Sequence, residues 1–225
     1  MTIAARYHIE MDSLRGNLLR MGGIVEEMLG LVVEALRQHD EGLARQCCEM
    51  DHQVDRLEKD IDEHCLRILA LHQPAAEELR FVAMSMKLVT DLERMGDLVT
   101  NIGERVISLS EGERPRVTID IQQLATLVRD MVRQALDSFV MGNVDLAQKV
   151  MRADERVDEL HWQFRRELVK QISEASESAH RGIELILLVK HLERLGDHAT
   201  NIAEEVIFLV HGRDVRHAYI EEHDG

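Results

Sequence analysis

The chain repeats part of itself, and this repeat limits its possible folds more than any other feature of the sequence. Residues 91–109 read DLERMGDLVTNIGERVISL, and residues 191–209 read HLERLGDHATNIAEEVIFL. The two segments align without gaps at an offset of 100 residues, and 12 of the 19 positions are identical. A shorter match pairs DHQVD at 51–55 with DERVD at 154–158, at an offset of 103 residues. The matches predict two tandem copies of one structural unit.

Chain-breaking residues divide the sequence into helical stretches. Gly112 and Pro115 fall near the midpoint and mark the boundary between the two units, and Pro74 can open a new helix, where its missing N–H costs little. The predicted helices span residues 7–39, 43–72, 75–110, 118–141, 144–172 and 178–211. We therefore expect an all-α fold of two tandem, pseudo-symmetric three-helix bundles, with residues 1–112 forming the first, 116–212 the second, and 213–225 a polar tail.

Apolar residues recur at alternating spacings of four and three in these helices, which is the pattern of a coiled-coil-like seam. The third predicted helix has them at 88, 92, 95, 99, 102, 106 and 109, and the sixth has them at 188, 192, 195, 199, 202, 206 and 209. Such seams are typical of helices that pack at shallow crossing angles. Only 3% of residues are aromatic, which disfavours a β-sandwich.

The charge and the chain ends narrow the functional classes. A net charge of −15 disfavours direct binding to nucleic acid, which requires a basic surface. No run approaches 18 apolar residues, and residues 1–10 lack the pattern of a signal peptide. The cysteines, Cys47, Cys48 and Cys65, are odd in number and fall in helical patterns, as expected for reduced thiols. These features predict a cytoplasmic protein.

Acidic side chains border the seam in the same register in four helices. Within each pair the two carboxylates are four residues apart, so they lie on one side of their helix, and each follows a seam residue by one or two positions. The pairs are Asp51 and Asp55, Glu93 and Asp97, Asp154 and Asp158, and Glu193 and Asp197; Asn101 and Asn201 extend two of them by one helical turn. We call these ten residues the acidic stripes, one stripe in each bundle.

Carboxylates that repel one another beside a buried seam need compensation. Bound cations would provide it, and carboxylate and amide oxygens form a hard site suited to magnesium, manganese, calcium or iron. Two alternatives stay open: Arg94 and Arg194 pair with the acids, or the stripes are solvated faces of a purely structural bundle. His161 continues the stripe of its helix and is a candidate extra ligand.

A second metal motif is a weaker alternative. Glu49 with His52 and Glu177 with His180 have the Glu-x-x-His spacing of di-iron carboxylate enzymes, but neither motif lies on a seam. His198 neighbours Asp97's counterpart, Asp197, but points about 100° away around the helix, so we expect it at the surface. The chain shows no Gly-rich phosphate loop, GxSxG or Cys-x-x-Cys motif, so an enzyme is not the leading hypothesis.

The motifs LERMGD-LVTNI and LERLGD-HATNI, each preceded by a DxxVD helix, resemble those of the PhoU family of phosphate-transport regulatory proteins. The resemblance extends from the first helix through Leu209 and implies two three-helix bundles. It also implies metal binding, with iron, zinc, manganese or magnesium as candidates. The family's motif falls on the acidic stripes, Asp51, Asp55, Glu93, Asp97 and Asn101 in the first bundle and Asp154, Asp158, Glu193, Asp197 and Asn201 in the second.

The function that this resemblance implies is regulatory rather than enzymatic. Members of the family restrain the phosphate ABC transporter and keep the phosphate-sensing histidine kinase in its signalling-off state when phosphate is plentiful. The resemblance thus implies an adaptor that contacts the transporter ATPase subunit and the kinase, reaches the membrane only through these partners, and forms a homodimer.

Overall fold

A computed structural model describes residues 3–110, 121–174 and 179–212. In this part of the chain the secondary structure consists of six helices and no strands, which confirms the expected all-α fold. The helices are α1 (Ile3–Gln38), α2 (Glu41–His72), α3 (Ala76–Ser110), α4 (Ile121–Met141), α5 (Val144–Glu174) and α6 (Ala179–His211). The expected linker after residue 112 and the expected tail after residue 212 lie outside the described residues.

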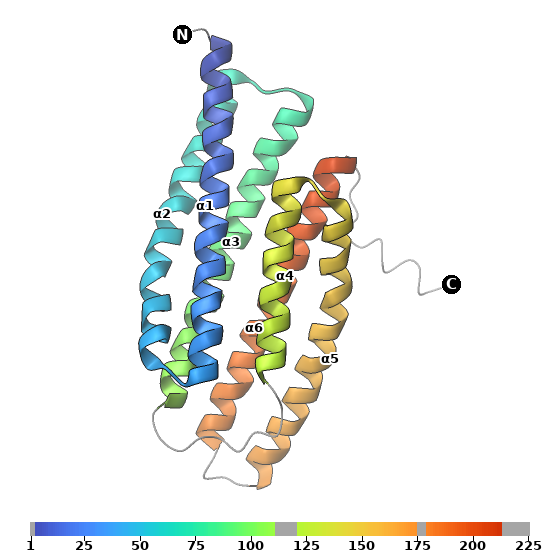
Figure 1. Cartoon of the computed structure of the whole chain (residues 1–225). Coiled ribbons are helices and arrows are strands. Elements are labelled where there is room, and N and C mark those ends of the chain that lie inside the picture. The colour runs from blue at the N-terminus through green and yellow to red at the C-terminus, as the bar shows by residue number, and fades with distance from the viewer. Residues whose placement is uncertain (1–2, 111–120, 175–178, 213–225) are drawn as a thin grey trace, which may run out of the picture.

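The helices form two three-helix bundles that lie side by side (Figure 1). Helices α1–α3 make the first bundle and α4–α6 the second, and the bundles meet where α3 packs on α6 and α1 on α4. Buried apolar residues from all six helices form one continuous core. The two repeats therefore share their hydrophobic interior.

The seams predicted from the sequence form this core. All seven seam residues of α3 are buried, and so are those of α6 except Leu209, which is partly buried. Leu92 and its counterpart Leu192 are 0% and 1% exposed. Alternating spacing thus identifies correctly which face of each helix points inward.

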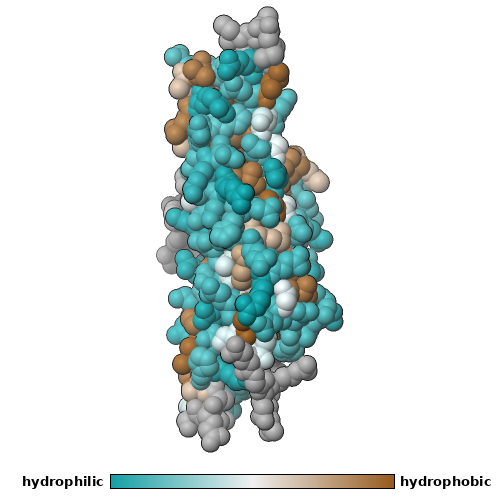
Figure 2. Space-filling view, turned by 90° about the vertical axis from the view of Figure 1, so that its left-hand side faces the viewer, coloured by the Kyte–Doolittle hydropathy of each residue, from teal (hydrophilic) through white to brown (hydrophobic). Residues whose placement is uncertain are grey.

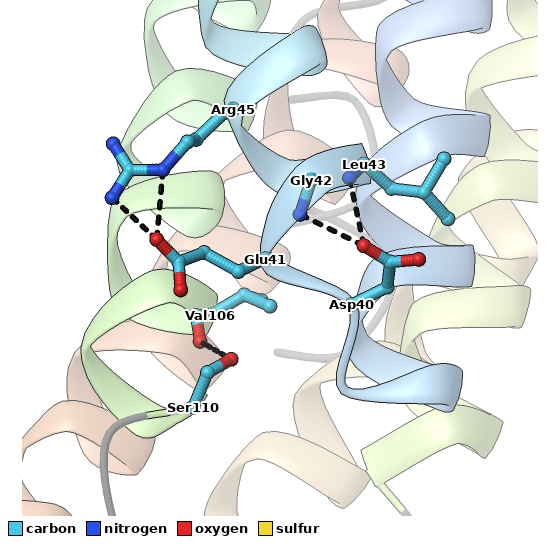
Figure 3. Close-up of polar contacts among 7 residues, drawn as sticks. All are labelled: Asp40, Glu41, Gly42, Leu43, Arg45, Val106 and Ser110. Carbon is cyan, nitrogen blue, oxygen red and sulfur yellow. Dashed lines mark hydrogen bonds and ion pairs between the residues drawn. The ribbon is translucent and has the colours of Figure 1, made fainter.

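The second helix of each bundle begins at a side chain that caps it. Asp40 Oδ1 accepts hydrogen bonds from the backbone N–H of Gly42 at 2.8 Å and of Leu43 at 3.2 Å (Figure 3). In the second bundle Asn143 Oδ1 accepts from the N–H of Leu146 at 3.0 Å. These caps satisfy backbone donors that the first helical turn leaves unpaired, and they fix where α2 and α5 start.

Charged side chains link the bundles across the α3–α6 junction. Arg105 Nη1 donates to Glu184 Oε2 at 3.0 Å, Lys87 Nζ donates to Glu205 Oε1 at 2.8 Å, and His198 Nδ1 lies 2.8 Å from Asp91 Oδ1. His198 is 7% exposed, so its predicted surface position is wrong. His198 is covered because α3 packs on this part of α6, which a single-helix pattern does not reveal.

The side of the first bundle that faces the viewer in Figure 2 is largely hydrophilic, with single hydrophobic residues scattered over it. None of the described helices is both long and apolar enough to cross a membrane.

Candidate metal site

The acidic stripe of the first bundle lies where α2 and α3 come close together. A Cβ atom placed on Gly96 of α3 would lie 3.1 Å from Asp51 Oδ1 and 3.2 Å from Val54 Cγ1, both on α2. The absence of a side chain at Gly96 lets α2 approach and bring the Asp51 carboxylate against α3. At the corresponding place in the second bundle, a Cβ on Gly196 would lie 3.4 Å from Val157 Cγ1 and 3.5 Å from Asp154 Oδ1. The recurring glycines therefore serve helix approach beside the acids.

In the first bundle, burial and neighbouring carboxylates on α2 and α3 disfavour the ionisation of Asp51 and Glu93. Burial raises the pKa of Asp51, and the charges of Asp55 and Asp97 raise it further. Burial also raises the pKa of Glu93, with added effects from Asp97 and Glu58. Since Asp97 acts on Asp51 across the helix boundary, the acid pairs of α2 and α3 lie beside the line where these helices meet, which we call the first groove.

The second bundle repeats this arrangement with a stronger effect. Burial, followed by Asp158 and Asp197, raises the pKa of Asp154 to about 6. Burial and then Asp158 raise the pKa of Asp197, and burial with Asp197 and Asp158 raises that of Glu193. The acids of α5 and α6 therefore form a second negatively charged groove.

Basic side chains do not neutralise these grooves. In the described parts of the chain, none of the eight carboxylates has a Lys or Arg nitrogen within 4.0 Å; their ion-pair contacts are His52 Nδ1 to Asp55 Oδ2 at 4.0 Å and His161 Nδ1 to Glu193 Oε1 at 3.6 Å. Asp154 Oδ1 is buried, and the donor beside the Asp154 carboxylate is the neutral hydroxyl of Thr200. A buried carboxylate with only a neutral donor beside it is costly, and a cation would stabilise it.

The donor set thus fits a metal ion in its chemistry. Within residues 3–110, 121–174 and 179–212, however, no three His, Cys, Asp or Glu side chains already surround one point that could hold an ion. Metal binding would require carboxylates on neighbouring helices to rotate toward a common centre. Such rotations are local, because each of these side chains borders the groove and none is held by an Arg or Lys.

The two asparagines are placed differently from each other. Asn101 Nδ2 donates to the backbone carbonyl of Asp97 at 2.8 Å, within its own helix. Asn201 Nδ2 instead reaches Asp91 Oδ1 on the first bundle at 3.4 Å. Both extend their stripes in sequence, but Asn201 is directed to the bundle junction.

Two further side chains belong to the grooves. His161 on α5 contacts Glu193, in agreement with its position on the sequence stripe. Glu58 on α2 acts on Glu93, and sequence reasoning missed it. The offset of 103 residues that relates α2 to α5 pairs Glu58 with His161, and this correspondence could have revealed it.

The alternative di-iron motif does not face the interior. Glu49 and His52 are both exposed on α2, and His180 is exposed near the start of α6. Glu177 lies outside the described residues. A di-iron carboxylate site needs inward-pointing ligands, which Glu49 and His52 do not provide.

Comparisons with known proteins agree with this architecture. A sequence model described as the PhoU domain matches residues 18–106 and 121–206, one match in each bundle. The chain is 44% identical over 216 residues to a phosphate-specific transport system accessory protein PhoU homolog of Pseudomonas putida, covering 96% of this chain and 84% of that protein.

Two solved structures have the same fold. The crystal structure of PhoU from Pseudomonas aeruginosa is 42% identical and superimposes with a TM-score of 0.89, covering 92% of this chain and all of that one. The phosphate transport system regulatory protein PhoU from Streptococcus pneumoniae is 28% identical with a TM-score of 0.84, covering 93% of this chain and 99% of that one.

Proposed function

The chain belongs to the PhoU family, and from this we propose that it regulates phosphate uptake and phosphate signalling as a metal-binding adaptor. It would contact the ATPase subunit of a phosphate ABC transporter and a phosphate-sensing histidine kinase, and restrain both when phosphate is plentiful. It would act in the cytoplasm as a homodimer, reach the membrane only through these partners, and catalyse no reaction. The names of its relatives, an accessory protein of the phosphate-specific transport system and a phosphate transport regulatory protein, support this role.

The observation that carries the metal-binding part is the pair of facing acid groups in each bundle. Asp51 and Asp55 face Glu93 and Asp97 in the first bundle without Lys or Arg partners among the described residues. Asp154, Asp158, Glu193 and Asp197 are arranged in the same register in the second. A bound cation would supply positive charge and join α2 to α3 and α5 to α6. We propose that the ten residues of the acidic stripes provide the ligands.

Charge explains why this cross-linking would matter to an adaptor. Without a cation, each groove contains carboxylates whose ionisation is disfavoured, so the helices that line it repel one another. With a cation, the same side chains hold neighbouring helices together, and the surface presented to partners becomes more rigid and less negative. Metal occupancy would thereby support binding of the transporter and kinase.

Elemental analysis and partner capture test the two parts of this proposal separately. Protein purified without chelator should contain metal, and the double variant Asp97→Ala with Asp197→Ala should lose most of it. Wild-type protein should also retain the purified transporter ATPase subunit and the cytoplasmic part of the sensor kinase in a pull-down. The double variant should retain less of both.

A matched control removes two acids outside the stripes. Asp60 and Glu155 are exposed, so Asp60→Ala with Glu155→Ala changes the net charge equally and should leave metal content and capture unchanged. Wild-type protein without metal would refute the metal site, whereas metal-loaded protein that captures neither partner would refute the adaptor role.

A further inference from the structure

The two acidic grooves differ in one donor. The 103-residue offset that superimposes Asp51 and Asp55 on Asp154 and Asp158 also superimposes Glu58 on His161. Both residues follow the second acid of their helix by three positions, so each lies on the same helix face as that acid. The first groove therefore has a carboxylate where the second has an imidazole.

His161 is built into the second groove rather than left in solvent. Its side chain is 16% exposed, that of Glu193 is 23% exposed, and His161 Nδ1 lies 3.6 Å from Glu193 Oε1. This separation exceeds the usual length of an N–H···O hydrogen bond. It is close to the ~3.4 Å that separates two ligands of a tetrahedral ion when each metal–ligand bond is about 2.1 Å long. One nitrogen and one oxygen are thus already spaced as ligands of a single ion.

Other donors lie near this pair. Asp158 and Asp197 are close enough to act electrostatically on the His161 ring, from α5 and α6 respectively. Asp154 Oδ1 is buried in the same groove, where burial and the charges of Asp158 and Asp197 raise the Asp154 pKa. In the first groove the equivalent neighbour of Glu93 is the Glu58 carboxylate, so that groove offers oxygen donors at each of these positions.

We propose that His161 is a direct metal ligand, so that the second bundle prefers zinc or iron(II) while the first, with oxygen donors, prefers magnesium or manganese. The inference rests on the proposed metal-binding function and adds to it a division of metals between the repeats. Imidazole nitrogen favours zinc and iron, whereas carboxylate and carbonyl oxygens suit magnesium and manganese. A single chain would then hold two kinds of ion in grooves of common ancestry.

His52 lies beside Asp55 of the first groove and provides an internal control. Its side chain is 77% exposed, and its Nδ1 lies 4.0 Å from Asp55 Oδ2. It has no equivalent in the second bundle, where the corresponding residue is Glu155. Because His52 is exposed on α2, it lacks the enclosed position that His161 has beside Glu193.

The test titrates chelator-treated, full-length protein with Zn²⁺ and with Mn²⁺ by calorimetry, and detects nitrogen coordination of bound Mn²⁺ by pulsed electron paramagnetic resonance. Wild-type protein should show two classes of Zn²⁺ site and a ¹⁴N signal. His161→Glu should lower the affinity of the tighter Zn²⁺ class by about 10- to 100-fold, the range seen when metal-site donors and their partners are altered. It should leave Mn²⁺ affinity within about threefold and abolish the ¹⁴N signal.

The reciprocal variant Glu58→His should raise Zn²⁺ affinity in the first bundle, and His52→Gln should change neither the affinities nor the signal. A Zn²⁺ affinity that is unchanged in His161→Glu, or a ¹⁴N signal that persists in it, overturns the inference while leaving the metal-binding function intact. Absence of Zn²⁺ and Mn²⁺ binding to wild-type protein instead refutes the proposed function itself. Circular dichroism of each variant confirms that lost binding is not lost folding.

Discussion

The first and second bundles have the same acid pairs in the same register, but the neighbours of those acids differ. Gly96 is tightly covered by Asp51 and Val54, whereas Gly196 has ordinary van der Waals clearance to Val157 and Asp154. Glu58 in one groove is replaced by His161 in the other. Asn101 bonds to its own helix, and Asn201 bonds across the junction. After duplication, the carboxylate positions were kept while the contacts that tune them diverged.

The largest expected effect tests whether the bundles are energetically separate. Leu92 and Leu192 are buried at equivalent seam positions, so Leu92→Ala and Leu192→Ala should each lower the free energy of unfolding by about 2–5 kcal/mol. Because one core runs through both bundles, both variants should shift a single cooperative transition in chemical denaturation.

Thiol labelling distinguishes cooperative unfolding of the two bundles from independent unfolding of each bundle. Every cysteine of the chain falls within the first bundle, and burial raises the pKa of Cys47 and Cys65 to about 12, so these thiols react when that bundle opens. Leu192→Ala should accelerate their labelling although it lies in the second bundle. Labelling that responds only to Leu92→Ala would show that the bundles open separately.

The next prediction concerns a contact that breaks the pseudo-symmetry of the junction. Arg105 donates to Glu184, whereas the equivalent pair of positions, 205 and 84, holds glutamate and methionine. The Glu184 side chain is 9% exposed, and Glu184→Gln removes the negative charge that pairs with the partly buried Arg105 guanidinium. This substitution should lower the free energy of unfolding by about 1–3 kcal/mol. Glu104→Gln is the control, because Glu104 pairs with the same arginine but is 54% exposed and should cost under about 0.5 kcal/mol. Equal effects in thermal denaturation would contradict a structural role for the Arg105–Glu184 pair.

The sequence alone supports most of the fold and the register of the acids. The seam positions of α3 and α6 follow from spacing, because a helix that buries one face must repeat apolar residues every three to four positions. Asp40 and Asn143 cap the starts of α2 and α5, and such caps are readable from sequence because cap residues act locally.

Features that depend on a second helix could not be predicted in this way. His198 is buried because α3 covers it, and the direction of Asn201 depends on Asp91, 110 residues earlier in the chain. Likewise, carboxylate spacing places acids on one helix face but does not determine whether side chains from two helices converge on one point. The grooves were thus predictable as locations, while their detailed geometry was not.

The glycines should respond in opposite directions. Replacing helical Gly with Ala contributes about 1 kcal/mol through helix propensity. At Gly196 the new methyl group would meet atoms at 3.4–3.5 Å, so Gly196→Ala should stabilise the metal-free protein by about 0.5–1 kcal/mol. At Gly96 it would lie 3.1 Å from Asp51 Oδ1 and 3.2 Å from Val54 Cγ1, so steric displacement should cancel the gain and destabilise the protein by about 1 kcal/mol. Equal stabilisation by both substitutions, measured by urea denaturation, would show that α2 and α5 move aside equally easily.

The smallest effects on stability should come from substitutions of the two asparagines, which occupy equivalent positions in the two stripes but have different contacts. Asn101→Ala removes a bond to its own helix backbone and improves helix propensity, so metal-free protein should gain at most about 0.5 kcal/mol. Asn201→Ala loses a 3.4 Å contact to Asp91, which retains His198 at 2.8 Å, so the free energy of unfolding of this variant should change by less than about 0.5 kcal/mol.

Metal affinity distinguishes the two asparagines more clearly than stability does. An Asn101 that can turn into its groove without breaking a contact between bundles should contribute more to metal affinity than Asn201, which must first release Asp91. Calorimetric titration should therefore show a larger loss for Asn101→Ala, and a larger loss for Asn201→Ala would mean that the junction opens when metal binds.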